Sequence, residues 1–339
     1  MSSSPSRITV IGAGVTGLSC AHELADAGHE VTVIADHGPG DTVSALAGAL
    51  WFPYSTGVSD EVLERSLVRF AELAALGDLG DGEDADPDAP EDFDDDVPPV
   101  QMRTGMLHER LDPPDRSWVA PVVKVLGEDA VRPVDGGVQA TLPMIMTSAY
   151  LAWLMDACRM AGVTFRWRTV ESLDELTDTA DAVVVAGGLR GGELLGGDDS
   201  LTPVRGQLML LANGDGGEDG PRLTDWVVDS DDPDQLTYVL PREDEIVVGG
   251  TAQAGSWDEA PDQETAEAIL ARAEALVPEL RELPILGHGV GLRPSRPTVR
   301  LERVDGLALP VVAAYGHGGA GVTLSWGTAE RVVELIAEL

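Results

Sequence analysis

The sequence predicts an α/β fold in which a doubly wound parallel sheet is joined to a second, mainly antiparallel sheet. Two patterns predict the parallel part: a strand–glycine–helix–strand unit near the N-terminus, and an apolar strand at 182–186 that ends in two glycines. A strand that is apolar on both faces is typical of a parallel sheet. Strand-rich segments at 204–211 and 226–250, punctuated by Gly and Asp turns, predict the antiparallel part.

The N-terminal unit has the order of a Rossmann-like nucleotide-binding motif. An apolar run at 7–11 enters a glycine turn, a helix follows over 18–27, and a second strand over 29–34 ends near Asp36. Glycines at 12, 14 and 17 allow a tight turn and a close approach of pyrophosphate, which the helix N-terminus attracts. Asp36 stands about 20 residues further on, where a carboxylate can accept hydrogen bonds from a ribose diol.

The glycine turn by itself leaves the ligand open. It does not distinguish FAD from NAD, although Asp36 argues against a 2′-phosphate. The alternative is a β-α-β unit that binds no nucleotide at all.

The remaining elements follow from hydrophobic periodicity. We expect helices at 59–76, 147–161, 263–277 and 325–338, and strands at 164–167 and 311–314. The densely acidic segment 77–97 is expected to be a solvated loop. The order of elements predicts a discontinuous nucleotide domain (1–55, 140–200 and 285–339) and a substrate domain made of 56–139 and 201–284.

Composition excludes several classes of partner. The net charge of −37 argues against nucleic acid and anionic membranes, because like charges repel. No apolar run is long enough to span a membrane and the first residues lack the core of a signal peptide, so we expect a cytoplasmic protein. Lys124 is the sole lysine among many arginines, which a GC-rich genome or a salt-rich habitat would explain equally.

The cysteines and histidines show no pattern of metal ligands. Cys20 and Cys158 lie in apolar helical segments, where reduced and buried thiols are expected. The six histidines lack the spacing of a metal site, so no metal is expected. His317 lies within a glycine-rich segment and is expected to be a hydrogen-bonded loop residue rather than a catalytic base.

Two motifs near the C-terminus carry the strongest chemical signal. Arg293 lies in Gly-Leu-Arg-Pro-Ser-Arg-Pro, and its planar guanidinium can hold a carboxylate in a bidentate pair. The sequence from Tyr315 to Thr323 contains four glycines, which let backbone N–H groups approach a flat ligand closely. The alternative is a glycine-rich surface turn beside an ordinary surface arginine.

A third segment could lie against the same flat ligand. Residues 42–54 pass from small side chains into the aromatic cluster Trp51-Phe-Pro-Tyr54. A loop of this composition can cover a flavin ring, and it can equally be a plain loop that enters the core.

Together these motifs resemble the D-amino-acid oxidase family of FAD flavoproteins over roughly residues 7–336. The resemblance is carried by the glycine turn, by 47–54, Arg205-Gly-Gln207, 238–241, 248–251 and the two C-terminal motifs. It implies a Rossmann-like FAD-binding domain beside a mainly antiparallel substrate domain. It also implies FAD as the cofactor, with a D-amino acid and O2 as partners. No cysteine or histidine stands out as a point of attachment, so non-covalent FAD is expected. A monomer and a homodimer both stay open.

The resemblance also assigns roles to residues. Arg293 and Tyr238 would bind the substrate carboxylate, the Gly319 carbonyl would accept the substrate amine, and Tyr54 would complete the catalytic set. Asp36 would hold the adenosine ribose and Val170 would contact adenine. The full FAD-contact set is Gly12, Ala13, Gly14, Val15, Thr16, Gly17, Asp36, His37, Thr42, Val43, Ser44, Gly48, Ala49, Leu50, Val170, Gly318, Gly319, Ala320, Gly321, Val322 and Thr323.

The implied reaction is oxidative deamination of D-amino acids by hydride transfer to flavin N5. The products are a 2-oxo acid, ammonia and hydrogen peroxide. Phe52 stands where the family has a glutamine, and residues 226–240 hold no arginine, so neutral, apolar substrates are expected. The alternatives are an oxidase for glycine, sarcosine or a pathway-specific amine, a nucleotide-binding protein without redox turnover, and an NAD-dependent dehydrogenase.

Overall fold

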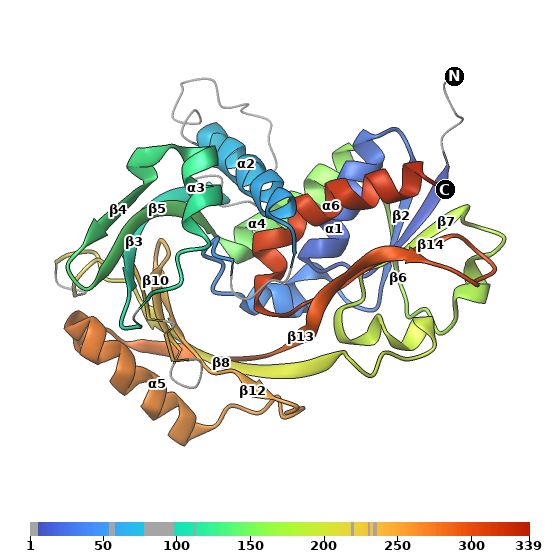
Figure 1. Ribbon diagram of the computed structural model, residues 1–339. Coiled ribbons are helices and arrows are strands. Elements are labelled where there is room, and N and C mark those ends of the chain that lie inside the picture. Colours follow the sequence, from blue (N-terminus) through green and yellow to red (C-terminus); the bar gives the residue numbers. More distant parts are fainter. Residues whose placement is uncertain are drawn as a thin grey trace, which may run out of the picture.

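The computed structural model describes residues 6–53, 58–77, 98–111, 113–217, 220–229, 231–232 and 236–339. Tyr54, expected in the catalytic set, and nearly all of the acidic segment 77–97 lie outside these residues. One sheet of 14 strands runs through the described residues, with the helices packed on its faces (Figure 1).

The helices agree closely with the periodicity of the sequence. They are α1 (Val15–Asp26), α2 (Asp60–Gly77), α3 (Val119–Leu126), α4 (Thr147–Met160), α5 (Gln263–Leu276) and α6 (Gly321–Ala337). Two differ from expectation: α3 was not predicted, and α6 begins at Gly321 rather than at residue 325. The glycine-rich segment therefore supplies the first turn of α6 instead of a separate loop.

The strands follow the order β4-β5-β3-β9-β10-β11-β8-β13-β14-β7-β1-β2-β6, with β12 paired to β8. Their bounds are β1 Arg7–Ile11, β2 Glu30–Ala35, β3 Val100–His108, β4 Val131–Val134, β5 Gly137–Ile145, β6 Thr164–Trp167, β7 Ala182–Val185, β8 Thr202–Ala212, β9 Trp226–Asp229, β10 Thr237–Pro241, β11 Glu245–Gly249, β12 Gln253–Ala254, β13 Ile285–Val304 and β14 Val311–His317.

The two expected kinds of sheet are both present. Strands β14, β7, β1, β2 and β6 are parallel to one another. Strands β8, β10, β11 and β13 pair antiparallel with their neighbours. The long strands β8 and β13 join the two parts into one hydrogen-bonded sheet, so the domain boundaries expected at 200/201 and 284/285 stay a prediction.

Three apolar clusters hold the layers together. Helices α1, α4 and α6 pack on one face of the parallel strands, and a second cluster around Ile34, Val183 and Leu176 covers the other face. Helix α5 packs through Ile269 against the outer face of the antiparallel strands. The opposite face of those strands contacts the N-terminal segment 43–48 and carries Tyr238 and Arg293.

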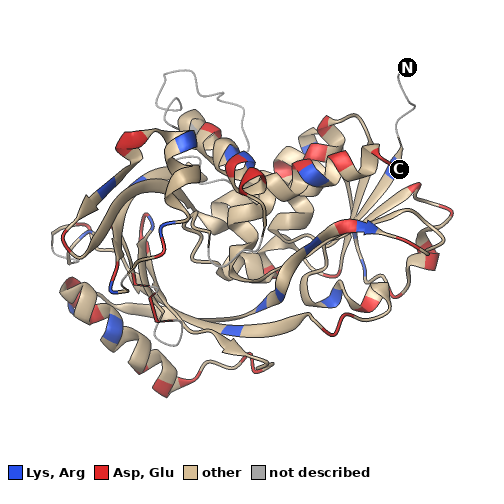
Figure 2. Ribbon diagram, in the orientation of Figure 1, with Lys and Arg blue, Asp and Glu red and all other residues tan. Residues whose placement is uncertain are grey.

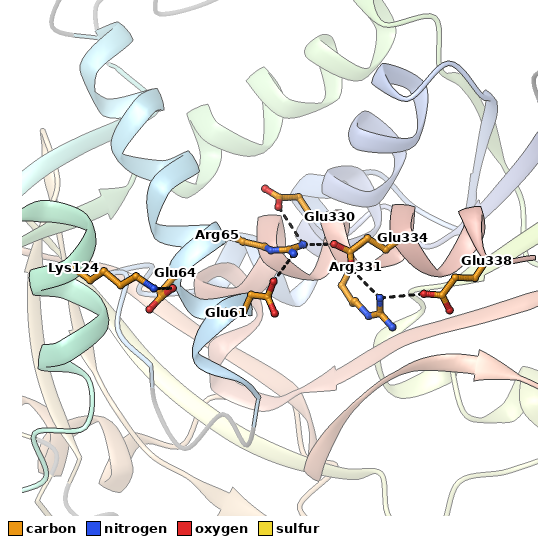
Figure 3. A network of polar contacts seen from close by, with 8 residues as sticks. All are labelled: Glu61, Glu64, Arg65, Lys124, Glu330, Arg331, Glu334 and Glu338. Carbon is orange, nitrogen blue, oxygen red and sulfur yellow. Dashed lines mark hydrogen bonds and ion pairs between the residues drawn. The ribbon is translucent and has the colours of Figure 1, made fainter. Parts of the chain in front are cut away.

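Charged contacts fasten α2 to α6 at the surface. Arg65 donates to Glu334 at 2.6 Å and to Glu61 at 2.6 Å, and lies 3.5 Å from Glu330 (Figure 3). Acidic side chains are nevertheless far more numerous than basic ones over the helices and loops (Figure 2). Cys20 and Cys158 are free and buried, as expected.

Candidate functional site

The glycine turn between β1 and α1 is closely packed against the next strand. Gly12 has a φ of +112°, and a β-carbon built on it would lie 2.5 Å from the Ala186 carbonyl oxygen. A β-carbon on Gly17 would lie 2.0 Å from the carbonyl oxygen of Gly12. Only glycine fits at these two positions, because a side chain would collide with backbone. The turn therefore brings the N-terminus of α1 to the carboxyl edge of the parallel strands.

Ser44 lies at that helix N-terminus although it is distant in sequence. Its hydroxyl accepts a hydrogen bond of 3.1 Å from the backbone N–H of Val15. The same oxygen is 3.3 Å from where a β-carbon of Gly14 would stand. The first N–H groups of a helix have no partner within the helix and attract anions. Gly14, Val15 and Ser44, all expected cofactor residues, thus lie together.

Asp36 lies at the end of β2 and is already engaged. Its carboxylate is 3.0 Å from Arg190 Nη1 and 2.6 Å from His37 Nδ1. Arg190 follows β7, so it reaches Asp36 from the strand on the far side of β1. Sequence reasoning did not single out Arg190. Val170, the expected adenine contact, is buried among apolar side chains.

Residues 42–52 leave the nucleotide end and join the antiparallel strands. A short 3-10 turn at Pro39–Asp41 precedes the segment, and a second at Val43–Leu46 begins it. Ile145 then donates to the Ala49 carbonyl at 2.9 Å, and Trp51 donates to the Pro143 carbonyl at 2.8 Å. Leu50 is thereby fixed beside β5. These bonds are compatible with both interpretations of the segment, a loop that covers a flavin ring and a plain loop that enters the core.

Arg242 holds the same segment from the other side. Its Nη2 donates to the Ala47 carbonyl at 2.7 Å, and its Nη1 lies 2.9 Å from the Glu245 carboxylate. Burial lowers the pKa of the Arg242 guanidinium from its ordinary value, while the Glu245 carboxylate opposes that shift. Sequence reasoning missed Arg242, whose signal was a basic residue directly after the 238–241 motif.

The C-terminal glycines connect β14 to α6. Residues Gly318–Ala320 form a 3-10 turn, and α6 begins at Gly321. A β-carbon on Gly319 would meet only Arg293 Cδ, at 3.8 Å, among the described residues. Thr323 in the first turn of α6 donates to the Phe52 carbonyl at 3.0 Å. The Gly318–Ala320 turn, the segment 42–52 and Arg293 therefore lie close together.

His317 is buried just before this turn. Its Nε2 lies 3.1 Å from the Thr328 hydroxyl oxygen. Burial lowers the pKa of His317 to about 4, so the ring is neutral at physiological pH. His317 is hydrogen-bonded, as expected, but it is the last residue of β14 rather than a loop residue.

Arg293 and Tyr238 lie on either side of the Gly249–Thr251 segment. Arg293 Nη1 donates to the Thr251 carbonyl at 2.7 Å, which is its sole hydrogen bond within the described ranges. The Tyr238 ring covers Gly249, since a β-carbon there would lie 2.2 Å from the ring carbon Cζ. The remaining guanidinium donors of Arg293 can therefore take a carboxylate beside the Tyr238 ring.

Among the described residues, no group of three or more His, Cys, Asp and Glu side chains could hold a metal ion. None of the helices in those same ranges is both long and apolar enough to cross a bilayer.

The fold and these contacts define a class of protein: an α/β protein with a glycine turn suited to a nucleotide and with Arg293 beside a second, glycine-lined turn. The family model described as "FAD dependent oxidoreductase" matches residues 7–335. The chain belongs to this family.

Curated relatives match over nearly the whole chain. A protein of Rubrobacter xylanophilus named D-amino-acid oxidase is 39% identical, and the match covers 97% of this chain and 95% of that protein. A human protein named D-aspartate oxidase is 32% identical, over 98% of this chain and 95% of that protein. The solved glycine oxidase of Geobacillus kaustophilus has a TM-score of 0.74 at 18% identity, covering 98% and 95% of the two chains, and shares the fold.

The described residues fit FAD, the cofactor of this family. The turn at Gly12 and Gly17 admits no side chain, and it brings the N-terminus of α1, whose positive end attracts a pyrophosphate, to Gly14 and Ser44. A β-carbon on Gly319 or Gly321 would make ordinary van der Waals contacts, with Arg293 Cδ at 3.8 Å and His317 Cβ at 3.9 Å. Without side chains at these two positions, a flat ring can approach the backbone closely.

Proposed function

We propose that this protein is a D-amino-acid oxidase that acts on neutral, apolar D-amino acids. Its homologues by name and family support the class of reaction. The observation that carries the proposal is the position of Arg293. Its Cδ lies 3.8 Å from where a β-carbon of Gly319 would stand, and its Nη1 donates to the carbonyl of Thr251, which follows the two glycines covered by the Tyr238 ring. A carboxylate clamp next to the cofactor turn is what oxidation at the α-carbon of an amino acid requires.

Each residue has a defined task in this proposal. Arg293 binds the substrate carboxylate through the donors that Thr251 leaves free, and Tyr238 donates its hydroxyl to the same carboxylate. The Gly319 carbonyl accepts a hydrogen bond from the substrate amine. Two points of attachment orient the bond between Cα and its hydrogen, and such positioning lowers barriers by roughly 7–11 kcal/mol in well-oriented systems.

FAD, when bound, supplies the two-electron acceptor for the hydride from Cα and passes both electrons to O2. The neutral amine nitrogen supplies the electron pair that forms the C=N bond as the hydride leaves, so no side-chain base is needed at Cα. Water then hydrolyses the imine to a 2-oxo acid and ammonia, and O2 is reduced to hydrogen peroxide.

The preference for apolar substrates is supported by the surroundings of Phe52. Its ring lies 5.3 Å from that of Trp118, and both side chains are almost fully buried. The nearby cation Arg242 is already held by Glu245 and the Ala47 carbonyl. An acidic side chain would therefore lack a free cationic partner, and its desolvation would be costly.

The test is the visible spectrum of the purified holoenzyme under anaerobic conditions. D-Valine is expected to bleach the flavin band, and L-valine is expected to leave it unchanged. Readmitted air should restore the band and release peroxide. A flavin band that persists with D-valine, D-alanine and D-leucine would refute the proposed function, and faster bleaching by D-aspartate would refute the apolar preference.

The oligomeric state and the cellular location are separate predictions. Light scattering would test for a homodimer, and fractionation of the source cells would test for a cytoplasmic location.

A further inference from the structure

The Arg293 guanidinium is confined on two sides. Beneath it lies Gly206, where a β-carbon would stand 2.4 to 2.6 Å from Nη2, Cζ and Nη1 of Arg293. At its edge, Nη1 donates to the Thr251 carbonyl at 2.7 Å. The plane of the guanidinium is thus set by the backbone of β8. Its rotation within that plane is set by the carbonyl of Thr251.

Thr251 is itself fixed by an unusual contact with β8. Strand β11 pairs with β8 up to Gly249, and β12 resumes the pairing at Gln253. Between them, the backbone N–H of Gln207 donates to the Thr251 hydroxyl oxygen at 2.9 Å. The Thr251 side chain therefore replaces a backbone acceptor where the ladder is interrupted. This bond holds the Thr251 carbonyl at the height of Arg293.

The same short segment supports Tyr238. A β-carbon on Gly250 would lie 2.9 Å from Cε1 of Tyr238, so the ring lies directly on this backbone. From the opposite face of the sheet, Arg272 of α5 donates to the Gly250 carbonyl at 3.1 Å. Residues 249–251 therefore fix the spacing between the Tyr238 ring and the Arg293 guanidinium.

We propose that Thr251 is a positioning residue for the substrate carboxylate. Its hydroxyl anchors the segment to Gln207, and its carbonyl orients Arg293 so that the free edge of the guanidinium faces Tyr238. This inference rests on the proposed function, because it assigns the ligand of Arg293 as an α-carboxylate. Thr251 touches neither the reacting bond nor the amine, so its effect should fall on binding rather than on the rate of hydride removal.

The experiment measures carboxylate binding separately from turnover. The probe is 3-methylbutanoate, which has the carbon skeleton of D-valine but no amine and cannot be oxidised by the proposed reaction. Its affinity for the holoenzyme is obtained from the perturbation of the flavin spectrum. Anaerobic mixing with D-valine gives the apparent substrate affinity and the limiting rate of bleaching.

Thr251→Val keeps the shape of the side chain and removes the acceptor. We expect it to weaken 3-methylbutanoate binding about tenfold, the effect of losing one buried hydrogen bond. The limiting rate of bleaching should change less than about twofold, and Thr251→Ser should restore affinity to within about threefold of the wild type. Thr251→Ala is measured in the same way if the valine variant does not fold.

Thr141→Val is the matched control. Thr141 is half-buried in the same sheet and shares a 2.9 Å hydroxyl contact with Thr104, so the variant also loses one hydroxyl contact. It should lower the melting temperature as much as Thr251→Val does, with no change in carboxylate affinity. Equal affinities for the wild type and Thr251→Val, or equal weakening by valine and serine, would overturn the inference.

The result is separable from a failure of the proposed function. Absence of bleaching by D-amino acids would refute the proposed function, while the titration with 3-methylbutanoate would still report on Thr251. A wild-type holoenzyme that binds no 3-methylbutanoate would overturn the positioning role itself.

Discussion

The Thr323 hydroxyl donates to the Phe52 carbonyl across 3.0 Å, joining residues that are far apart in the chain. The Phe52 N–H in turn donates to the Thr323 hydroxyl oxygen at 3.4 Å. One side chain in the first turn of α6 therefore fixes the end of the N-terminal segment 42–52. The contact joins that segment to the Gly318–Ala320 turn.

Thr323→Val should loosen this junction. The variant keeps its shape but removes the hydrogen bond from the Thr323 hydroxyl to the Phe52 carbonyl, at a cost of about 0.5–1.5 kcal/mol. Calorimetry should show a lower melting temperature, and titration of the apoprotein should show weaker FAD binding. Thr323→Ser retains the hydroxyl and should behave like the wild type; equal FAD affinity in the valine variant would contradict the role of this contact.

Arg293→Ala should remove substrate affinity and leave the cofactor in place. Losing a charge-assisted bidentate pair costs about 2–5 kcal/mol in binding. The apparent affinity for D-valine should fall at least about 30-fold, while the flavin spectrum of the variant stays that of the holoenzyme. Arg293→Lys should recover only part of the loss, because a point charge cannot form the planar pair. Unchanged affinity in the alanine variant would show that the carboxylate binds elsewhere.

Gly12→Ala should prevent formation of the nucleotide site. The new β-carbon would stand 2.5 Å from the Ala186 carbonyl oxygen, in a backbone conformation that L side chains rarely adopt. Gly28→Ala is the control, because Gly28 has a φ of +91° with no described atom within 4 Å. The control should cost about 1–2 kcal/mol from backbone strain alone. FAD binding measured by fluorescence quenching should survive Gly28→Ala and be lost in Gly12→Ala.

His317 should make stability depend on pH in mildly acidic solution. Burial lowers the pKa of His317 to about 4, against an ordinary value of 6.5. The unfolded chain therefore binds the proton more readily than the folded protein does. Stability from this group is complete above pH 6.5 and is lost as the pH falls toward 4, by up to about 3 kcal/mol.

His317→Gln isolates that contribution. The carboxylates titrate similarly in both proteins, so the difference between their unfolding free energies reports on His317. That difference should shift against the wild type as the pH falls from about 7 to about 4. Parallel pH profiles for the two proteins would show that residue 317 does not titrate in this range.

Salt should stabilise the protein. With 59 acidic and 22 basic side chains, most carboxylates have no cation to pair with, and they repel one another. Raising KCl from about 0.1 to about 1 M shortens the Debye length from about 10 to about 3 Å and screens this repulsion. Ion pairs such as those of Arg65 in Figure 3 weaken too, but they are outnumbered. The melting temperature should rise equally in KCl and NaCl; a fall would mean that the ion pairs dominate.

Much of this architecture could be predicted from local patterns. The glycine turn, α1 and Asp36 follow from spacing that depends on only a few neighbouring residues. Arg293 could be singled out because its chemistry is visible in its residue type. Strand β13 was missed because Pro294 and Pro297 argue against a strand. Pro297 falls within the register shift between Ser295 and Arg300, and Pro294 lies opposite Pro203 of β8.

The supporting residues could not be predicted in the same way. Arg242 and Arg272 donate to backbone carbonyls, and Thr251 accepts from a backbone N–H, and these groups become neighbours only when the sheet is assembled. Their residue types are ordinary, and no local spacing announces a contact to residue 47 or 250. The glycines at 249 and 250 were a usable signal, because adjacent glycines in a strand indicate a close approach of another group.

Strands β8 and β13 are paired by backbone hydrogen bonds along most of their length, from Ser295 to Ile285. Because β13 also pairs with β14, the nucleotide end and the carboxylate end of the molecule are parts of one continuous sheet. A hinge motion between these two ends would have to break backbone hydrogen bonds between β8 and β13. The protein therefore cannot enclose a substrate by hinged closure of two separate domains. Substrate entry and product release are therefore expected to depend on small rearrangements at the rim of the site, while the continuous sheet keeps Arg293 at a fixed distance from the turn after β14.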